Sequence, residues 1–357
     1  MVTPALRMGS RPRRAAAWAV FALVAAALLA ALPATAITYI HQFPPDPRSP
    51  WAPLVSDGAG NLYGTTIGGG ASDRGIVFTI KTDSTGFAVL HEFAGGVAEG
   101  WGPLGRLVLE GGFLYGTTQG GGASGNGTIF KVQTDGTLFA TLHSFAGGPA
   151  DGESPAGLTS DGAGNLYGTT QYGGASGNGA VFSIQTGGAG CGVVYSLGGG
   201  TEGAFPLGEL ALDGAGNLYG TTSQSGASGS GTIFKVSTDG LTFSVLHAFA
   251  GAPADGRDAE GGLLLLGGTL YGTTLLGGAT GQGSVFSIST SGGGITLLHS
   301  FAGGPADGKN PRAAVLVSDG VNLYGATEYG GSSDLGTVFS MTMGARYVVS
   351  RIATPAR

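Results

Sequence analysis

Residues 161–183 read DGAGNLYGTTQYGGASGNGAVFS, in which leucine, tyrosine, valine and phenylalanine stand among glycines and small polar residues. The stretch recurs along the chain. Its Leu-Tyr-Gly-(Thr/Ala)-Thr core begins at intervals of 52 or 53 residues, at Leu62, Leu114, Leu166, Leu218, Leu270 and Leu323. Because a fixed period of this length indicates a repeat architecture, the sequence predicts six copies of one structural unit.

Each repeat contains the signals of four short strands. In the third repeat we expect these strands at 155–160, 165–170, 180–185 and 192–197, where aromatic and β-branched residues are bounded by Gly and Asp-Gly. After residue 36 no apolar pattern with helical spacing is sustained, so we expect almost no helix. Four repeats carry Asp-Gly-x-x-Asn between the first two strands, whereas two carry Gly-Gly, which suits a two-residue turn with positive φ.

Four-stranded repeats of this length are typical of a β-propeller, whose blades are buried on both faces. The low share of charged residues, 11%, and the 73 glycines fit closely packed blades. We therefore predict an all-β fold, a six-bladed β-propeller of four-stranded blades over residues 37–343, followed by a C-terminal tail at 344–357. The alternative is a β-solenoid, whose rungs are usually about half this long or less.

We expect an N-terminal strand to close the ring. Residues 39–43, YIHQF, copy the Leu-His-x-Phe piece of the fourth strands, but the first three strands of that unit are missing. Repeat six has no clear copy of this piece. Pairing the two would tie the ends together and remove free sheet edges. Residues 347–352 form a rival closing strand.

Residues 1–36 have the pattern of a signal peptide. Four arginines precede an uncharged apolar run at 15–32, and Ala34-Thr35-Ala36 follows as a cleavage site. The alternative is an uncleaved N-terminal membrane anchor, because the apolar run is long for a signal peptide. The predicted location is secreted, periplasmic or at the cell surface, with no membrane span once the signal is removed.

The charge of the mature chain disfavours two classes of partner. Sixteen Lys and Arg include the four in residues 1–36, so twelve remain against 22 Asp and Glu, a net charge of −10. This balance disfavours nucleic acids and anionic membranes. The single cysteine, Cys191, has no partner for an internal disulfide, and we interpret it as a small packing residue.

The repeats resemble those of the GloVer tandem-repeat family of exported bacterial proteins. The resemblance rests on residues 161–170, Gly173-Gly174 and Val181-Phe182, and it covers residues 37–342 in six copies. It implies an extracellular protein. No activity, cofactor or catalytic residue is established for the family, so the resemblance implies none. Residues 346–357 lack the hydrophobic tail of the surface-anchored members.

The glycine runs and the aromatic residues of the repeats are interpreted as structural. Each glycine run, such as 173–179, precedes a strand and lacks the Lys-Ser or Lys-Thr of a phosphate-binding loop. The rings lie in fixed registers, one per blade, where each histidine is expected to be buried and hydrogen-bonded within its own blade rather than bound to a metal. These residues are His91, His143, Tyr195, His247 and His299 in the fourth strands and Tyr63, Tyr115, Tyr167, Tyr219, Tyr271 and Tyr324 in the second strands.

One acidic residue follows the fourth strand of each of the first five repeats. These candidates for ligand binding are Glu99, Asp151, Glu202, Asp255 and Asp307. In an up-and-down blade, the loop after strand four and the loop between strands two and three emerge on the same face. The acids therefore either build turns or form a ring of carboxylates that attracts a cation or a basic partner, with a catalytic role as a third interpretation.

The preferred function is that of an exported, non-enzymatic repeat protein, a monomer without cofactor or metal, that binds a protein or glycan partner through one propeller face. The sequence shows no catalytic motif, although it leaves enzyme activity undecided. One alternative is a secreted carbohydrate-active hydrolase or lyase, with irregular residues such as Trp101, Arg106, Asp258 and Glu260 over the centre of the ring. The other is a structural component of a surface layer or matrix.

Overall fold

The computed structural model describes residues 50, 52–311, 315–343 and 347–348. The chain divides into two units, Met1–Tyr39 and Ile40–Arg357, and every described residue belongs to the second. The predicted signal peptide and the predicted closing strand at 37–43 lie outside the described residues. Within the ranges just given, the structure contains no helix that could serve as a membrane span.

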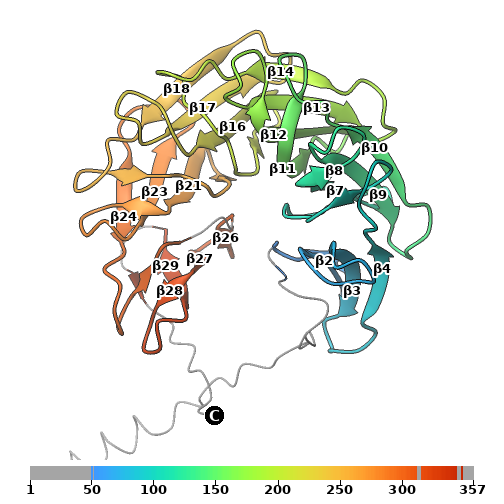
Figure 1. The fold of residues 1–357 in the computed structure, drawn as a ribbon. Helices are drawn as coiled ribbons and strands as arrows, with labels where there is room; N and C mark the ends of the chain where they lie inside the picture. Colours follow the sequence, from blue (N-terminus) through green and yellow to red (C-terminus); the bar gives the residue numbers. More distant parts are fainter. Residues whose placement is uncertain (1–49, 51, 312–314, 344–346, 349–357) are drawn as a thin grey trace, which may run out of the picture. The chain divides into compact units, whose positions relative to one another are not determined.

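Six four-stranded antiparallel sheets form the blades of a β-propeller (Figure 1), and the solenoid alternative is wrong. The first strands are β1 (Val55–Ser56), β6 (Val108–Glu110), β11 (Gly152–Ser160), β15 (Ala211–Leu212), β20 (Leu264–Leu266) and β26 (Val317–Ser318). The second strands are β2 (Asn61–Thr66), β7 (Phe113–Thr118), β12 (Asn165–Gly173), β16 (Asn217–Thr222), β21 (Thr269–Thr274) and β27 (Asn322–Thr327).

The third and fourth strands complete each sheet toward its outer edge. The third strands are β3 (Ile76–Lys81), β9 (Thr128–Gln133), β13 (Ala180–Gln185), β17 (Thr232–Ser237), β23 (Ser284–Ser289) and β29 (Thr337–Thr342). The fourth strands are β4 (Ala88–Glu92), β10 (Ala140–Ser144), β14 (Gly192–Ser196), β18 (Phe243–Ala248), β24 (Thr296–Ser300) and β30 (Tyr347–Val348). In repeat three the expected boundaries hold for β13, whereas β11 and β12 are each three residues longer than expected.

The packing of strand two against strand three explains the Leu-Tyr-Gly motif. Gly168 is the register partner of Phe182, and a Cβ at Gly168 would lie 2.6 Å from Cζ of that ring. In repeat four a Cβ at Gly220 would lie 2.4 Å from Cζ of Phe234. The glycine therefore leaves the space that the phenylalanine ring of the same repeat fills, and the two residues recur together in all six blades.

The hydrophobic core lies between consecutive blades. One cluster joins Tyr167 and Val181 of blade three to Leu218 and Phe234 of blade four. Four further clusters join the other consecutive blades in the same way, from blades one and two to blades five and six. Burial of both sheet faces explains why the strands carry so few charged residues.

The two turn chemistries between strands one and two behave as predicted. Gly111 and Gly112 both have positive φ, 58° and 80°, as a two-residue hairpin turn of this type requires. In repeat three, Asp161 Oδ1 instead accepts hydrogen bonds from the backbone N–H groups of Ala163 and Asn165 at 2.8 and 3.0 Å. Both arrangements deliver the second strand in the same register.

Blade six is less complete than the others within the described residues. Its fourth strand pairs at Ser340↔Val348 and Met341↔Tyr347, so the rival segment at 347–352 supplies a short fourth strand. Val338, two residues before Ser340 on the third strand, is 40% exposed. Its counterparts in the other repeats face a fourth-strand residue and are fully buried: Val77, Ile129, Val181, Ile233 and Val285.

We expect a chain that begins at residue 44 to melt several degrees lower than a chain that begins at residue 37. Full burial of one valine side chain stabilises a fold by about 1.5–3 kcal/mol, and Val338 lacks part of this burial because it is 40% exposed. Removal of 349–357 is the matched control. If the C-terminal deletion destabilises the protein and the N-terminal deletion does not, the rival strand closes the ring. Calorimetry of both truncations measures the difference.

Candidate functional site

The segments after the fourth strands lie against the segments after the second strands of the next repeat. Short two-stranded sheets join them: β5 (Gly100–Trp101) with β8 (Gly120–Gly121), β19 (Gly256–Arg257) with β22 (Leu276–Gly277), and β25 (Gly308–Lys309) with β28 (Tyr329–Gly330). In blade three the same pairing, Gly152↔Gly173, is part of β11 and β12. Both sets of loops therefore share one face, as expected. We call the surface formed by these paired segments the loop face.

The five acidic residues proposed for ligand binding contact the ring in the fourth strand of their own repeat. The side-chain distances are 3.4 Å for His91–Glu99, 3.2 Å for His143–Asp151, 3.1 Å for Tyr195–Glu202, 2.5 Å for His247–Asp255 and 3.2 Å for His299–Asp307. The carboxylates also accept backbone hydrogen bonds, for example from Ala146 N to Asp151 Oδ2 at 2.8 Å. Each contact fastens a loop of the loop face to the blade below it.

Burial sets the electrostatics of these contacts. It lowers the pKa of His91 and of His299, while the neighbouring Glu99 and Asp307 oppose the shift. Desolvation, together with the hydrogen bond to Glu202, raises the pKa of Tyr195 to about 12. In the described part of the chain, no group of three or more His, Cys, Asp and Glu side chains is placed to hold a metal ion.

The six tyrosines of the second strands pack in the blades. Tyr63, Tyr115, Tyr167 and Tyr219 are buried, and Tyr271 and Tyr324 are half-buried. The hydroxyl of Tyr219 donates to Asp213 Oδ2 at 3.0 Å, which links the second strand to its preceding turn. Cys191 is half-buried beside the cluster of blades two and three, and burial raises the pKa of its thiol to about 12.

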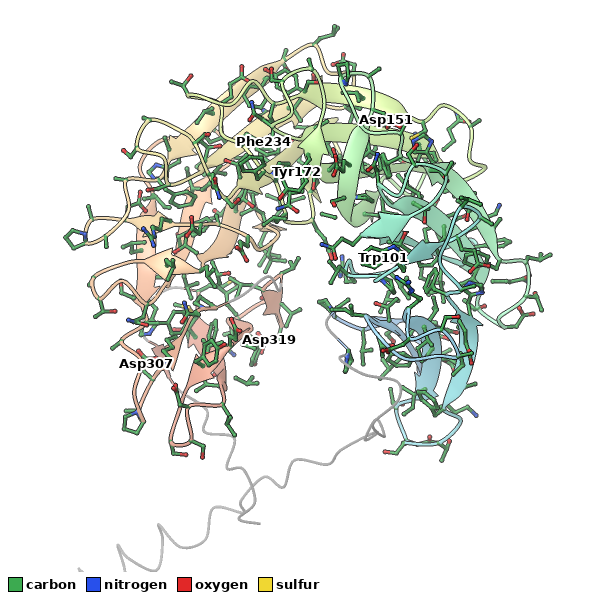
Figure 2. All side chains as sticks on the ribbon, in the orientation of Figure 1. Trp101, Asp151, Tyr172, Phe234, Asp307 and Asp319 are labelled. Carbon is green, nitrogen blue, oxygen red and sulfur yellow. The ribbon has the colours of Figure 1, made fainter. Side chains whose placement is uncertain are left out.

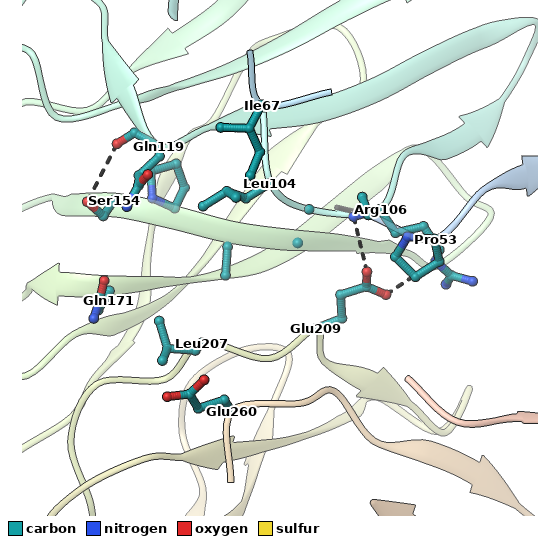
Figure 3. A pocket seen from close by; sticks show the side chains of 15 residues that line it. Pro53, Ile67, Leu104, Arg106, Gln119, Ser154, Gln171, Leu207, Glu209 and Glu260 are labelled. Carbon is teal, nitrogen blue, oxygen red and sulfur yellow. Dashed lines mark hydrogen bonds and ion pairs between the residues drawn. The ribbon is translucent and has the colours of Figure 1, made fainter. Parts of the chain in front are cut away.

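A cavity of 390 Å³ opens among the inner ends of blades one to five (Figure 3). Its polar lining includes the amides of Gln119 and Gln171, the hydroxyl of Ser154 and the side chains of Arg106, Glu209 and Glu260. Its apolar lining includes Ile67, Leu104 and Leu207. Gln119 and Gln171 each follow the Thr-Thr pair of their second strand. Equivalent positions of two successive blades therefore line the same cavity.

An ion pair crosses one side of this cavity. Arg106 Nε of blade two lies 3.2 Å from Glu209 Oε2 of blade four, and the Arg106 backbone N–H donates to Glu209 Oε1 at 3.2 Å (Figure 3). The Nε contact is an ion pair without the alignment of a hydrogen bond. Gly157 of blade three lies between them, where a Cβ would sit 2.2 Å from Glu209 Cγ. Burial raises the pKa of Glu209, and the charge of Arg106 opposes this shift.

A strained backbone residue stands at the entrance to the first strand in several blades. Ser154, Phe205, Asp258 and Asn310 have φ between 53° and 59°, a region that non-glycine residues rarely adopt. Each donates its N–H to a glycine-rich loop of the preceding blade, for example Ser154 to Asn126 O at 2.9 Å. These hydrogen bonds hold the strained backbone in place.

The chain matches the model of the Gloeobacter/Verrucomicrobia repeat over residues 30–214 and again over 193–352. It belongs to this family. The resemblance seen in the sequence is thereby confirmed. No curated protein matches the chain.

Several solved structures share the fold of this Gloeobacter/Verrucomicrobia repeat protein. A proposed 6-phosphogluconolactonase from Bacteroides uniformis is 14% identical, with a TM-score of 0.56 over 85% of this chain and 84% of that one. A second, from Bacteroides fragilis, is 15% identical, with a TM-score of 0.55 over 85% and 83%. TolB from Acinetobacter baumannii is 12% identical, with a TM-score of 0.48 over 82% and 64%. At 14% and 15% identity, the likeness to the two Bacteroides proteins concerns the fold alone.

The lining of the cavity in this repeat protein was only partly visible from its sequence. Arg106 and Glu260 stand out as irregular residues, but Gln119, Ser154, Gln171 and Glu209 were missed. The available signal is variation between the repeats in fixed registers. The position after the Thr-Thr pair (Ala-Thr in repeat six) holds Ile67, Gln119, Gln171, Ser223, Leu275 and Glu328. The position before the leucine at the start of strand one holds Pro53, Arg106, Gly157, Glu209, Gly262 and Val315.

Proposed function

We propose that this exported, non-enzymatic repeat protein binds a neutral glycan through the loop face, with one sugar unit held in the cavity among the inner ends of the blades. The lining of that cavity is the observation that carries the proposal. It combines two amides, a hydroxyl and a carboxylate with three aliphatic side chains. Export is supported by the signal-like residues 1–36 and by the family.

The chemistry of the lining favours a sugar over other small ligands. Each glutamine amide offers donors and an acceptor, which suits adjacent hydroxyl groups, while Ile67, Leu104 and Leu207 provide apolar surface for the C–H face of a sugar ring. Arg106 is the cation among the lining residues of the cavity, and Glu209 neutralises it. Phosphorylated or sulfated ligands are therefore disfavoured.

The distribution of variable residues supports a recognition role. The core residues and the ring–carboxylate contacts repeat from blade to blade, whereas the residues around the cavity differ between the repeats. The fold alone does not require a different side chain at these positions in each blade. Hydrolase or lyase chemistry is less well supported, because Glu209 is held by Arg106 and does not provide a second acid–base carboxylate.

The test is binding of the folded mature protein to an array of cello-, xylo-, manno- and chito-oligosaccharides, followed by calorimetric titration. We expect the double substitution Gln119→Ala and Gln171→Ala to weaken binding about tenfold or more, because it removes several hydrogen bonds of about 0.5–1.5 kcal/mol each. The matched control replaces Gln133 and Gln185, which end the third strands of the same repeats. Equal affinity of both variants, or no binding to any sugar, would contradict the proposal.

A further inference from the structure

A second hollow lies on the loop face at blade three. Its volume is 640 Å³, and it is lined by Gly148, Pro149, Glu153, Tyr172, Gly174 and Gly177. The two side chains with binding chemistry, Glu153 and Tyr172, are register partners across β11 and β12. The glycines on either side leave the ring and the carboxylate accessible.

Tyr172 lies on β12 of blade three (Figure 2). Its side chain is 39% exposed, and its ring centroid lies 5.4 Å from that of Phe205 in an edge-on arrangement. Phe205 is one of the residues with positive φ, fixed by a 2.9 Å hydrogen bond from its N–H to Asn178 O. A partly exposed aromatic ring that is supported at one edge presents a flat apolar surface. Because the contact restricts the ring, ligand binding costs little further side-chain conformational entropy.

The hairpin of β11 and β12 connects this hollow to the cavity. Successive side chains of a strand point to opposite sides, and here Ser154 and Gln171 line the cavity while their neighbours Glu153 and Tyr172 line the hollow. In blades two, five and six the corresponding pairing forms a separate two-stranded sheet. In blade three, by contrast, this pairing is part of the blade sheet itself, at the ends of the nine-residue strands β11 and β12.

The same register in the other blades lacks this combination. The counterparts of Tyr172 are Gly120, Gln224, Leu276 and Tyr329 in blades two, four, five and six. Tyr329 is paired with Lys309, whose Nζ lies 5.6 Å from the ring centroid and bonds to Asp334. An aromatic ring opposite a carboxylate therefore occurs at blade three, directly beside the cavity.

We propose that Tyr172 and Glu153 form a second sugar subsite, in which the ring stacks on a sugar and the carboxylate accepts its hydroxyl hydrogens. The ligand is then a neutral oligosaccharide that extends from the cavity across the β11–β12 hairpin. This inference rests on the proposed function, because it takes the cavity as the first subsite.

The test is calorimetric titration with cello-oligosaccharides of two to six units, with manno- and chito-oligosaccharides as parallel series. We expect the affinity of the unaltered protein to rise about tenfold or more with chain length, as a second linked contact is added. Tyr172→Ala should remove this rise and leave the shortest sugar unaffected, Tyr172→Phe should retain it, and Glu153→Gln should reduce it. Tyr329→Ala, at the same register in blade six, is the control.

The outcomes separate the two proposals. Binding of a short sugar with no gain for longer ones overturns the subsite and leaves the cavity in place. The subsite also fails if Tyr329→Ala and Tyr172→Ala have the same effect. If no sugar of any length binds, both proposals fail. Thermal melts of all variants show whether a loss of binding reflects a loss of folding.

Discussion

Phe234→Ala is expected to lower the free energy of unfolding by about 3–5 kcal/mol, the usual cost of emptying the site of a buried phenylalanine. Phe234, on β17 (Figure 2), has no exposed surface and packs over Gly220. It also packs against Phe243, with the two ring centroids 5.8 Å apart. The cavity would lie between blades three and four, where rigid sheets on both sides cannot move together to fill it.

Urea denaturation measures this loss, with Leu241→Ala as the control. Leu241 is 83% exposed in the turn before β18, so its truncation should change stability by less than about 0.5 kcal/mol. Gly220→Ala should also destabilise the protein, by about 1–3 kcal/mol, because its Cβ would meet the same ring. A Phe234→Ala variant as stable as the Leu241→Ala variant would contradict the blade packing described here.

Arg106→Met is expected to make stability fall more steeply with rising pH than it does in the unaltered protein, where burial already raises the pKa of Glu209. Without the guanidinium, Glu209 keeps its burial and loses the charge that favours its ionised form, so its pKa rises further. The folded protein then holds a proton that the unfolded chain releases near its ordinary pKa of about 4.3. Stability therefore falls as the pH rises above that value, by up to about 1.4 kcal/mol per pH unit, until the folded carboxyl ionises.

At pH 8 the variant should lose about 2–4 kcal/mol of its free energy of unfolding. This is less than the cost of breaking a fully buried ion pair, because Arg106 is 41% exposed. Urea denaturation between pH 4 and 8 measures it. The double variant Arg106→Met with Glu209→Gln is the control, since it has no carboxyl to titrate and should lose the pH dependence. Equal slopes for the single and double variants would show that Glu209 is not the titrating group.

The repeat period made the fold predictable, because the glycine and phenylalanine represented by Gly168 and Phe182 recur together in every repeat. In each blade the glycine leaves the space that the phenylalanine ring fills. The site was harder to predict for a physical reason. Arg106 and Glu209 are 103 residues apart, and their contact depends on Gly157 in the intervening blade. Neither residue repeats, so no periodic signal indicates the pair. The exposed ring of Tyr172 was likewise hidden within a motif whose other residues serve the core.

The ring–carboxylate contacts also bear on how the family can diversify. Because His143 and Asp151 secure the backbone beneath Glu153, the outward residue carries little responsibility for folding. Under the proposed function, substitutions at Glu153 change ligand preference while the His143–Asp151 contact beneath keeps the backbone in place.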